Sequence, residues 1–200
     1  ENAHKKSDIS NEPDQGRRKV LIGLTAGFAA AGVAFAATPF VTTWNPSARA
    51  KAIGSAVKVD VSKMMVGQQI QVSWRKQPIL IIRHSPSALS GLASVTSKLA
   101  DPNSDSIDEP YKNINATRSL SAEYSVLSGV CTHLGCSPKY YPEVEPKPWD
   151  SSWEGGFFCP CHGSMFDLVG RVYKGVPAPT NLTVPPHFFE GSILTIGEEA

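Results

Sequence analysis

The N-terminal part of the chain changes abruptly from polar to apolar. Residues 1–19 are polar with mixed charge and end in Arg17-Arg18-Lys19, after which no charged residue occurs before Arg49. A helix over the apolar residues 20–41 would be roughly 33 Å long, and the hydrocarbon core of a bilayer is about 30 Å thick. The pattern therefore predicts a polar tail followed by one transmembrane anchor.

Two other interpretations of residues 20–41 stay open. The segment could be a signal peptide that is cleaved, with Ala34-Phe35-Ala36 as the candidate processing site. It could also be a buried core helix, although it has no polar face.

The basic residues before this segment bear on export and orientation. Arg17-Arg18 in front of a weakly apolar segment is typical of a twin-arginine export signal. The positive-inside rule then predicts that residues 1–19 lie in the cytoplasm and that the remainder faces the periplasm. The chain would thus be a single-pass protein of a bacterial inner membrane.

Beyond the anchor, the pattern indicates a neck and an all-β head. Residues 42–56 are small and polar and predict a flexible neck. From residue 57 onward, apolar and polar positions alternate in many short runs, which is typical of strands. The expected strands are 57–61, 69–74, 78–82, 123–130, 155–158, 182–184 and 192–196. One helix is expected at 86–99 and a loop at 101–118, so residues 57–200 predict an antiparallel β-sandwich.

All four cysteines lie in two short motifs, C-T-H-L-G-C at 131–136 and C-P-C-H-G-S at 159–164. Each motif offers a thiolate and an imidazole, which bind both zinc and iron–sulfur clusters. A zinc site of two cysteines and two histidines is therefore the alternative to a cluster.

The spacing favours the cluster. Only one residue separates Cys131 from His133, whereas structural zinc sites use longer ligand spacings. The glycines in both motifs let backbone amides approach sulfide atoms closely. One iron would take Cys131 and Cys159 and the other His133 and His162, which is the ligand set of a Rieske [2Fe–2S] centre.

The two remaining cysteines have no place in this ligand set. Cys136 and Cys161 are free to form a disulfide that joins the two motifs. A disulfide requires an oxidising compartment, in agreement with export.

Other features of the sequence carry less chemistry. The net charge of +1 lacks the basic surplus of nucleic-acid-binding proteins. His4, His84 and His187 have no partner at ligand spacing and are predicted to be structural.

The two motifs, together with Lys174-Gly175-Val176-Pro177-Ala178-Pro179, resemble the Rieske iron–sulfur subunits of ubiquinol–cytochrome c reductase, the cytochrome bc complex. The long segment between the motifs resembles the proteobacterial type. The resemblance implies a Rieske-type head with a small cluster-binding subdomain at about 128–180 and one [2Fe–2S] cluster. It also implies electron transfer from ubiquinol to cytochrome c1 within a dimeric complex that contains cytochrome b.

The same resemblance implies roles for single residues. His162 would meet ubiquinol and take its proton, with Leu134 and Gly135 beside it at the quinol-site interface. Ser164 would donate a hydrogen bond to a cluster sulfide. A proline loop would cover the cluster, with Gly175, Pro177 and Pro179 among its residues.

One position departs from the family pattern. The family often has a tyrosine two residues after the serine, where this chain has Phe166. Because a hydrogen bond to a ligand sulfur stabilises the reduced cluster, its loss predicts a lower midpoint potential.

Two rival functions remain: a Rieske subunit of another exported oxidoreductase, such as an arsenite-oxidase-like enzyme, and a zinc-stabilised, disulfide-bonded periplasmic module.

Overall fold

The computed structural model describes residues 14–106, 111 and 115–199, except for the side chain of residue 53. The chain divides into two compact units, residues 1–49 and 50–200. His4 lies outside the described residues.

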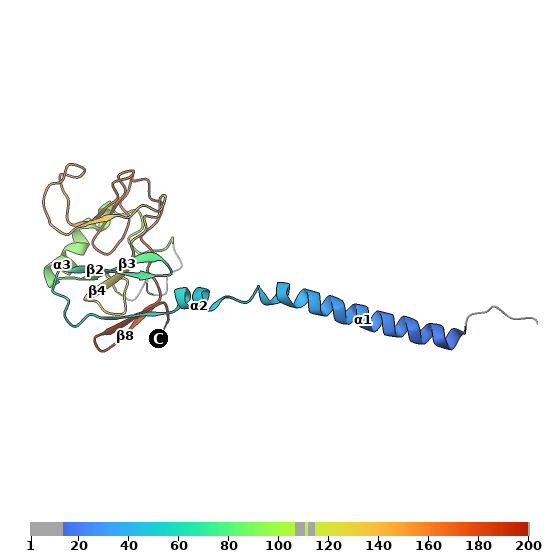
Figure 1. Ribbon diagram of the computed structural model, residues 1–200. Coiled ribbons are helices and arrows are strands. Elements are labelled where there is room, and N and C mark those ends of the chain that lie inside the picture. Colours follow the sequence, from blue (N-terminus) through green and yellow to red (C-terminus); the bar gives the residue numbers. More distant parts are fainter. Residues whose placement is uncertain (1–13, 107–110, 112–114, 200) are drawn as a thin grey trace, which may run out of the picture. The chain divides into compact units, whose positions relative to one another are not determined.

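The first unit is dominated by the long helix α1, Gln15–Thr42 (Figure 1). It begins five residues before the apolar segment because the Asp14 carboxylate caps it, accepting hydrogen bonds from the backbone amides of Gly16 and Arg17. The helix is long and apolar enough to cross a membrane. None of its residues is buried.

The predicted neck contains a second helix, α2, Ala48–Gly54. The neck is therefore more regular than its small, polar sequence indicated. The sequence Ala48-Arg49-Ala50-Lys51-Ala52 explains this, because alanine, arginine and lysine are good helix formers.

The described part of the head contains three antiparallel sheets, each of three strands. The first has the order β1 (Val57–Asp60), β9 (Ile193–Ile196), β8 (His187–Glu190). The second has the order β2 (Gln69–Trp74), β3 (Gln77–Arg83), β4 (Tyr124–Ser128). The third, small sheet has the order β5 (Lys139–Tyr141), β6 (Gly156–Phe158), β7 (Met165–Phe166). The helix α3 (Pro86–Val95) and the short 3₁₀ helix η1 (Thr96–Lys98) follow β3.

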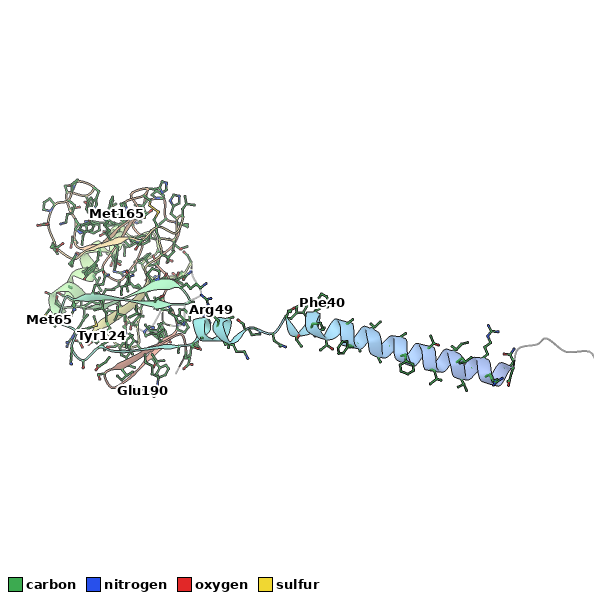
Figure 2. The ribbon with its side chains drawn as sticks, in the orientation of Figure 1. Phe40, Arg49, Met65, Tyr124, Met165 and Glu190 are labelled. Carbon is green, nitrogen blue, oxygen red and sulfur yellow. A yellow bond between two sulfur atoms is a disulfide. The ribbon has the colours of Figure 1, made fainter. Side chains whose placement is uncertain are left out.

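The three sheets lie one above another in Figure 1, with β8 at the bottom and the small sheet at the top. Figure 2 accordingly shows Met165 at one end of the head, Glu190 at the other and Tyr124 between them. The middle strand β3 explains this order, because both of its faces are buried. Ile79 and Ile81 join the core with the first sheet, whereas Leu80 and Ile82 join the core with the small sheet. A strand covered on both faces has a continuous apolar sequence rather than an alternating one.

The antiparallel sandwich is confirmed, and the helix expected at 86–99 is observed as α3 followed by η1. The strand expected at 182–184 is wrong: this segment is extended but unpaired in a sheet, and single backbone bonds tie it to Gly170 and Ser128. Its Leu182 and Val184 are buried because the segment crosses the core, which imitates a strand pattern. The strands β5, β7 and β8 were not expected from the sequence.

Candidate metal centre

Both cysteine motifs form loops on the small sheet. Residues 131–136 lie between β4 and β5, and residues 159–164 connect β6 to β7. The loops close alike: the Cys131 amide donates to the carbonyl of Cys136, and the Cys159 amide donates to that of Ser164. The fifth residue of each loop is a glycine with a positive φ, 83° at Gly135 and 77° at Gly163. That conformation favours glycine, so the sequence spacing produces two similar turns.

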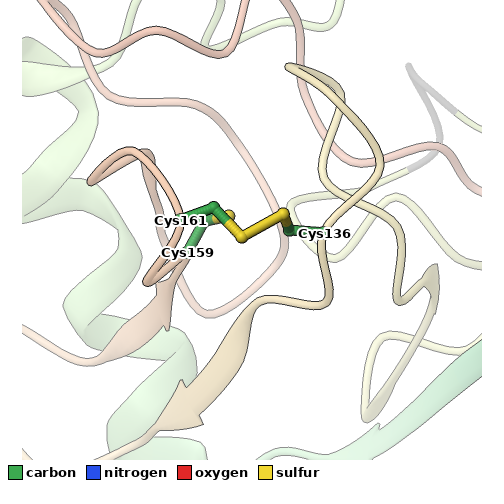
Figure 3. A group of neighbouring side chains, drawn as sticks. All are labelled: Cys136, Cys159 and Cys161. Carbon is green, nitrogen blue, oxygen red and sulfur yellow. A yellow bond between two sulfur atoms is a disulfide. The ribbon is translucent and has the colours of Figure 1, made fainter.

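The disulfide predicted between Cys136 and Cys161 is confirmed. Figure 3 shows Cys159 beside it, and the sulfur atoms of these three cysteines lie within 4.8 Å of one another. Two of the three sulfurs are bonded to each other and are unavailable as thiolates. Cys131 and Cys159 remain as free thiols, each 2% exposed.

The surroundings of Cys131 suit a metal-bound sulfur. Burial raises the pKa of its thiol, and the adjacent Cys159 raises it further. In the opposite direction, hydrogen bonds from the His133 backbone amide and the Ser164 hydroxyl lower this pKa. Donors aimed at a buried sulfur stabilise its negative charge, so a bound metal would meet two adjacent thiolates with suitable partners.

The two motif histidines lie together and are more exposed than these thiols. The ring centroids of His133 and His162 are 4.8 Å apart, with an interplanar angle of 89°. His162 is exposed and His133 is half-buried. Two buried thiols and two outer imidazoles fit a [2Fe–2S] cluster with two histidine ligands on one iron.

A third loop contacts both motif loops. It spans residues 175–180 and contains the predicted Gly175, Pro177 and Pro179. The Ala178 amide donates to the Ser164 hydroxyl oxygen at 3.0 Å. The Thr132 hydroxyl donates to the Thr180 carbonyl at 2.7 Å.

Two further residues that the sequence singled out differ in exposure. Leu134 is 72% exposed, next to the exposed Gly135. Phe166 is fully buried in the core that contains Cys131 and Cys159, and it brings no hydroxyl to this core.

The sequence did not reveal a buried polar network behind the loops. The Asp167 carboxylate is 1% exposed as a side chain, and it accepts a bond of 2.7 Å from the guanidinium of Arg171. Asn181 and Arg118 are also buried and bond to backbone carbonyls of distant segments. The only hint of this network in the sequence was a turn-like segment, Asp167-Leu168-Val169-Gly170-Arg171.

Comparisons with known proteins agree with this geometry. Residues 55–186 match the family model described as "Rieske [2Fe-2S] domain". Residues 8–47 match the model described as "Ubiquitinol-cytochrome C reductase Fe-S subunit TAT signal", in agreement with the twin-arginine prediction.

Full-length relatives point the same way. The chain is 48% identical over 184 residues to the ubiquinol-cytochrome c reductase iron-sulfur subunit of Allochromatium vinosum, covering 92% of this chain and 89% of the relative. It is 40% identical to the subunit of that name from Blastochloris viridis, covering 94% and 96%. A chain of the solved "Hyperthermophilic respiratory Complex III" matches with a TM-score of 0.50 and 27% identity, over 88% of this chain and 98% of that chain.

These matches decide between the rival interpretations. A zinc module would not be expected to match the cluster-binding family over most of the head. An unrelated exported oxidoreductase would not be expected to share the N-terminal segment. The chain therefore belongs to the Rieske iron–sulfur subunits of ubiquinol–cytochrome c reductase, whose cofactor is one [2Fe–2S] cluster.

Proposed function

We propose that Cys131 and Cys159 bind one iron of the cluster and that His133 and His162 bind the other. The chain then transfers single electrons from ubiquinol to cytochrome c1, in a membrane complex with cytochrome b. When bound, the cluster supplies a one-electron acceptor. The chain's own residues must position it, shield it and handle the proton of the quinol.

The exposure of the donor residues carries the proposal. Both free cysteines are 2% exposed, whereas the ring of His162 is exposed. A quinol therefore has access to the imidazole edge and not to the sulfur ligands. A quinol hydroxyl at this edge would bond to His162, whose imidazole would accept its proton.

Leu134 supports docking against an apolar partner surface at the same edge. It is 72% exposed, one residue after His133. Gly135 follows it with no side chain that would hold the partner away. Removing this exposed leucine side chain from water in a docked complex would be favourable.

The remaining parts fit a membrane-anchored subunit. The helix α1 can cross a bilayer, and the disulfide between Cys136 and Cys161 suits an oxidising periplasm. Residues 42–56 would act as the tether that lets the head visit two partners. We also propose that the complex is a dimer, as the family resemblance implies.

A matched pair of truncations tests the docking edge. Leu134→Ala should lower ubiquinol-driven reduction of cytochrome c by membranes roughly tenfold, the effect of removing a central contact. Val144→Ala is the control, because Val144 is 73% exposed on the segment between β5 and β6.

Both variants should keep the electron paramagnetic resonance (EPR) spectrum of the reduced cluster. Val144→Ala should also keep normal turnover. Equal turnover in the two variants would refute Leu134 as part of the quinol-site interface.

A further inference from the structure

The loop at 175–180 controls a hydrogen bond that reaches a ligand sulfur. Its Ala178 amide donates to the oxygen of Ser164. The single proton of the Ser164 hydroxyl is then left for another acceptor, and this hydroxyl lowers the pKa of the Cys131 thiol. A small displacement of the 175–180 loop would therefore change the donor that faces this sulfur.

Asn181, directly after this loop, is fully buried and uses its whole side-chain amide. Its oxygen accepts from the backbone amide of Val172 at 2.7 Å. Its nitrogen donates to the Asp101 carbonyl and to the Ser104 hydroxyl, each at 2.9 Å. One side chain thus ties the end of the 175–180 loop to segments about eighty residues away in sequence.

The segment that receives Asn181 also holds the other end of the 175–180 loop. The Lys174 backbone amide donates to the Lys98 carbonyl at 2.9 Å, and its side chain reaches the Ser97 carbonyl at 2.9 Å. Residues 97–104 therefore support both ends of the loop. The Lys174 side chain is exposed, whereas the bonds of Asn181 are buried, and an unmatched buried group costs about 1–3 kcal/mol.

We propose that Asn181 is a positioning residue for the cluster. It fixes the 175–180 loop where Ala178 can bond to Ser164, and it thereby sets the hydrogen bond from Ser164 to the ligand sulfur. The inference rests on the ligand set proposed above. Since hydrogen bonds to ligand sulfurs stabilise the reduced cluster, a loosened loop lowers its midpoint potential.

The test is an EPR-monitored redox titration of the full chain in its membranes. Asn181→Asp keeps an oxygen for the Val172 amide but replaces the donor that faces the Asp101 carbonyl. We expect a lower midpoint potential and about tenfold faster loss of the cluster to a chelator, the effect of one buried hydrogen bond. Ser104→Ala removes a single acceptor, so it should fold normally and lower the potential by a smaller amount.

Asn115→Asp is the matched control. The Asn115 side chain is half-buried, and its nitrogen donates to the Ser119 carbonyl within its own turn at 2.6 Å. This variant should lose stability and keep the wild-type potential.

Unchanged or higher potentials in both Asn181→Asp and Ser104→Ala, measured on the loaded fraction, would overturn the proposal and leave Asn181 a purely structural residue. Such a result would leave the proposed function standing, because that function is tested by turnover in the Leu134 variant and not by the potential.

Discussion

The head holds two pairs of histidines in opposite surroundings. His133 and His162 lie at the tip, with touching rings and access to solvent. His84 follows β3 and His187 lies on β8, and they are 3% and 0% exposed. The same residue type is available to a metal and a substrate in one region and enclosed in the other.

The hydrogen bonds of the buried pair explain its role. His187 Nδ1 faces the Pro185 carbonyl at 2.9 Å, so it must donate, and its Nε2 then accepts from the Ser119 hydroxyl at 3.0 Å. His84 Nε2 bonds to the Ser125 hydroxyl at 2.8 Å. Burial lowers the pKa of His84 to about 4 and also lowers that of His187. These two buried rings are therefore neutral. The comparison shows that a histidine here suits a metal centre only where its ring is exposed and free thiols lie nearby.

The largest expected effect comes from substituting one histidine of each pair. His162→Ala should abolish the EPR signal of the reduced cluster, because one ligand is lost. His187→Gln should keep the full signal and lower stability by about 2 kcal/mol, as buried hydrogen bonds are lost. EPR and thermal unfolding of both variants provide the check. A retained Rieske signal in His162→Ala would show that His162 is not a ligand of the cluster.

A drop in pH should destabilise the head through His84. Its folded-state pKa of about 4 lies below the unfolded value of about 6.5, so unfolding takes up a proton in this window. Stability therefore falls as the pH falls from 6.5 towards 4, by about 2–3 kcal/mol between pH 7.5 and pH 4.5.

Thermal unfolding of detergent-solubilised protein at the two pH values measures this loss. In His84→Asn, which has no titrating ring, the loss should be smaller by that amount. An identical loss in both proteins would show that His84 does not titrate on unfolding.

The smallest effect is expected from substituting Phe166, which lies in the core that contains Cys131 and Cys159. Phe166→Tyr should raise the midpoint potential, because a hydroxyl near the ligand sulfurs stabilises the reduced cluster. Phe157→Tyr is the control, since Phe157 pairs with Phe166 across β6 and β7 and is equally buried. In a redox titration, an unchanged or lower value for Phe166→Tyr would contradict this explanation.

The fold was predictable where burial follows a local period. β2 and β9 alternate or run apolar over their length, and the segment 69–74 was placed at its observed bounds. The strand expected at residues 182–184 was wrong because this segment crosses the core without pairing in a sheet. β7 has two residues and β8 follows two prolines, so neither offers a period to detect.

The candidate site was predictable in its donors and not in their support. The cysteines, histidines and glycines of the two motifs fix their own turns over six residues. Asn181 and Arg118 act across 80 and 64 residues of sequence, so no local pattern could announce them. Long-range hydrogen bonds need the folded chain before their partners can be known.

Pulsed EPR of the reduced full chain, labelled with ¹⁵N-histidine, tests whether two histidines bind the cluster. We expect hyperfine couplings from two histidine nitrogens, assigned to His133 and His162. A spectrum with one histidine coupling or none, or a sample that is EPR-silent and contains zinc, would contradict it.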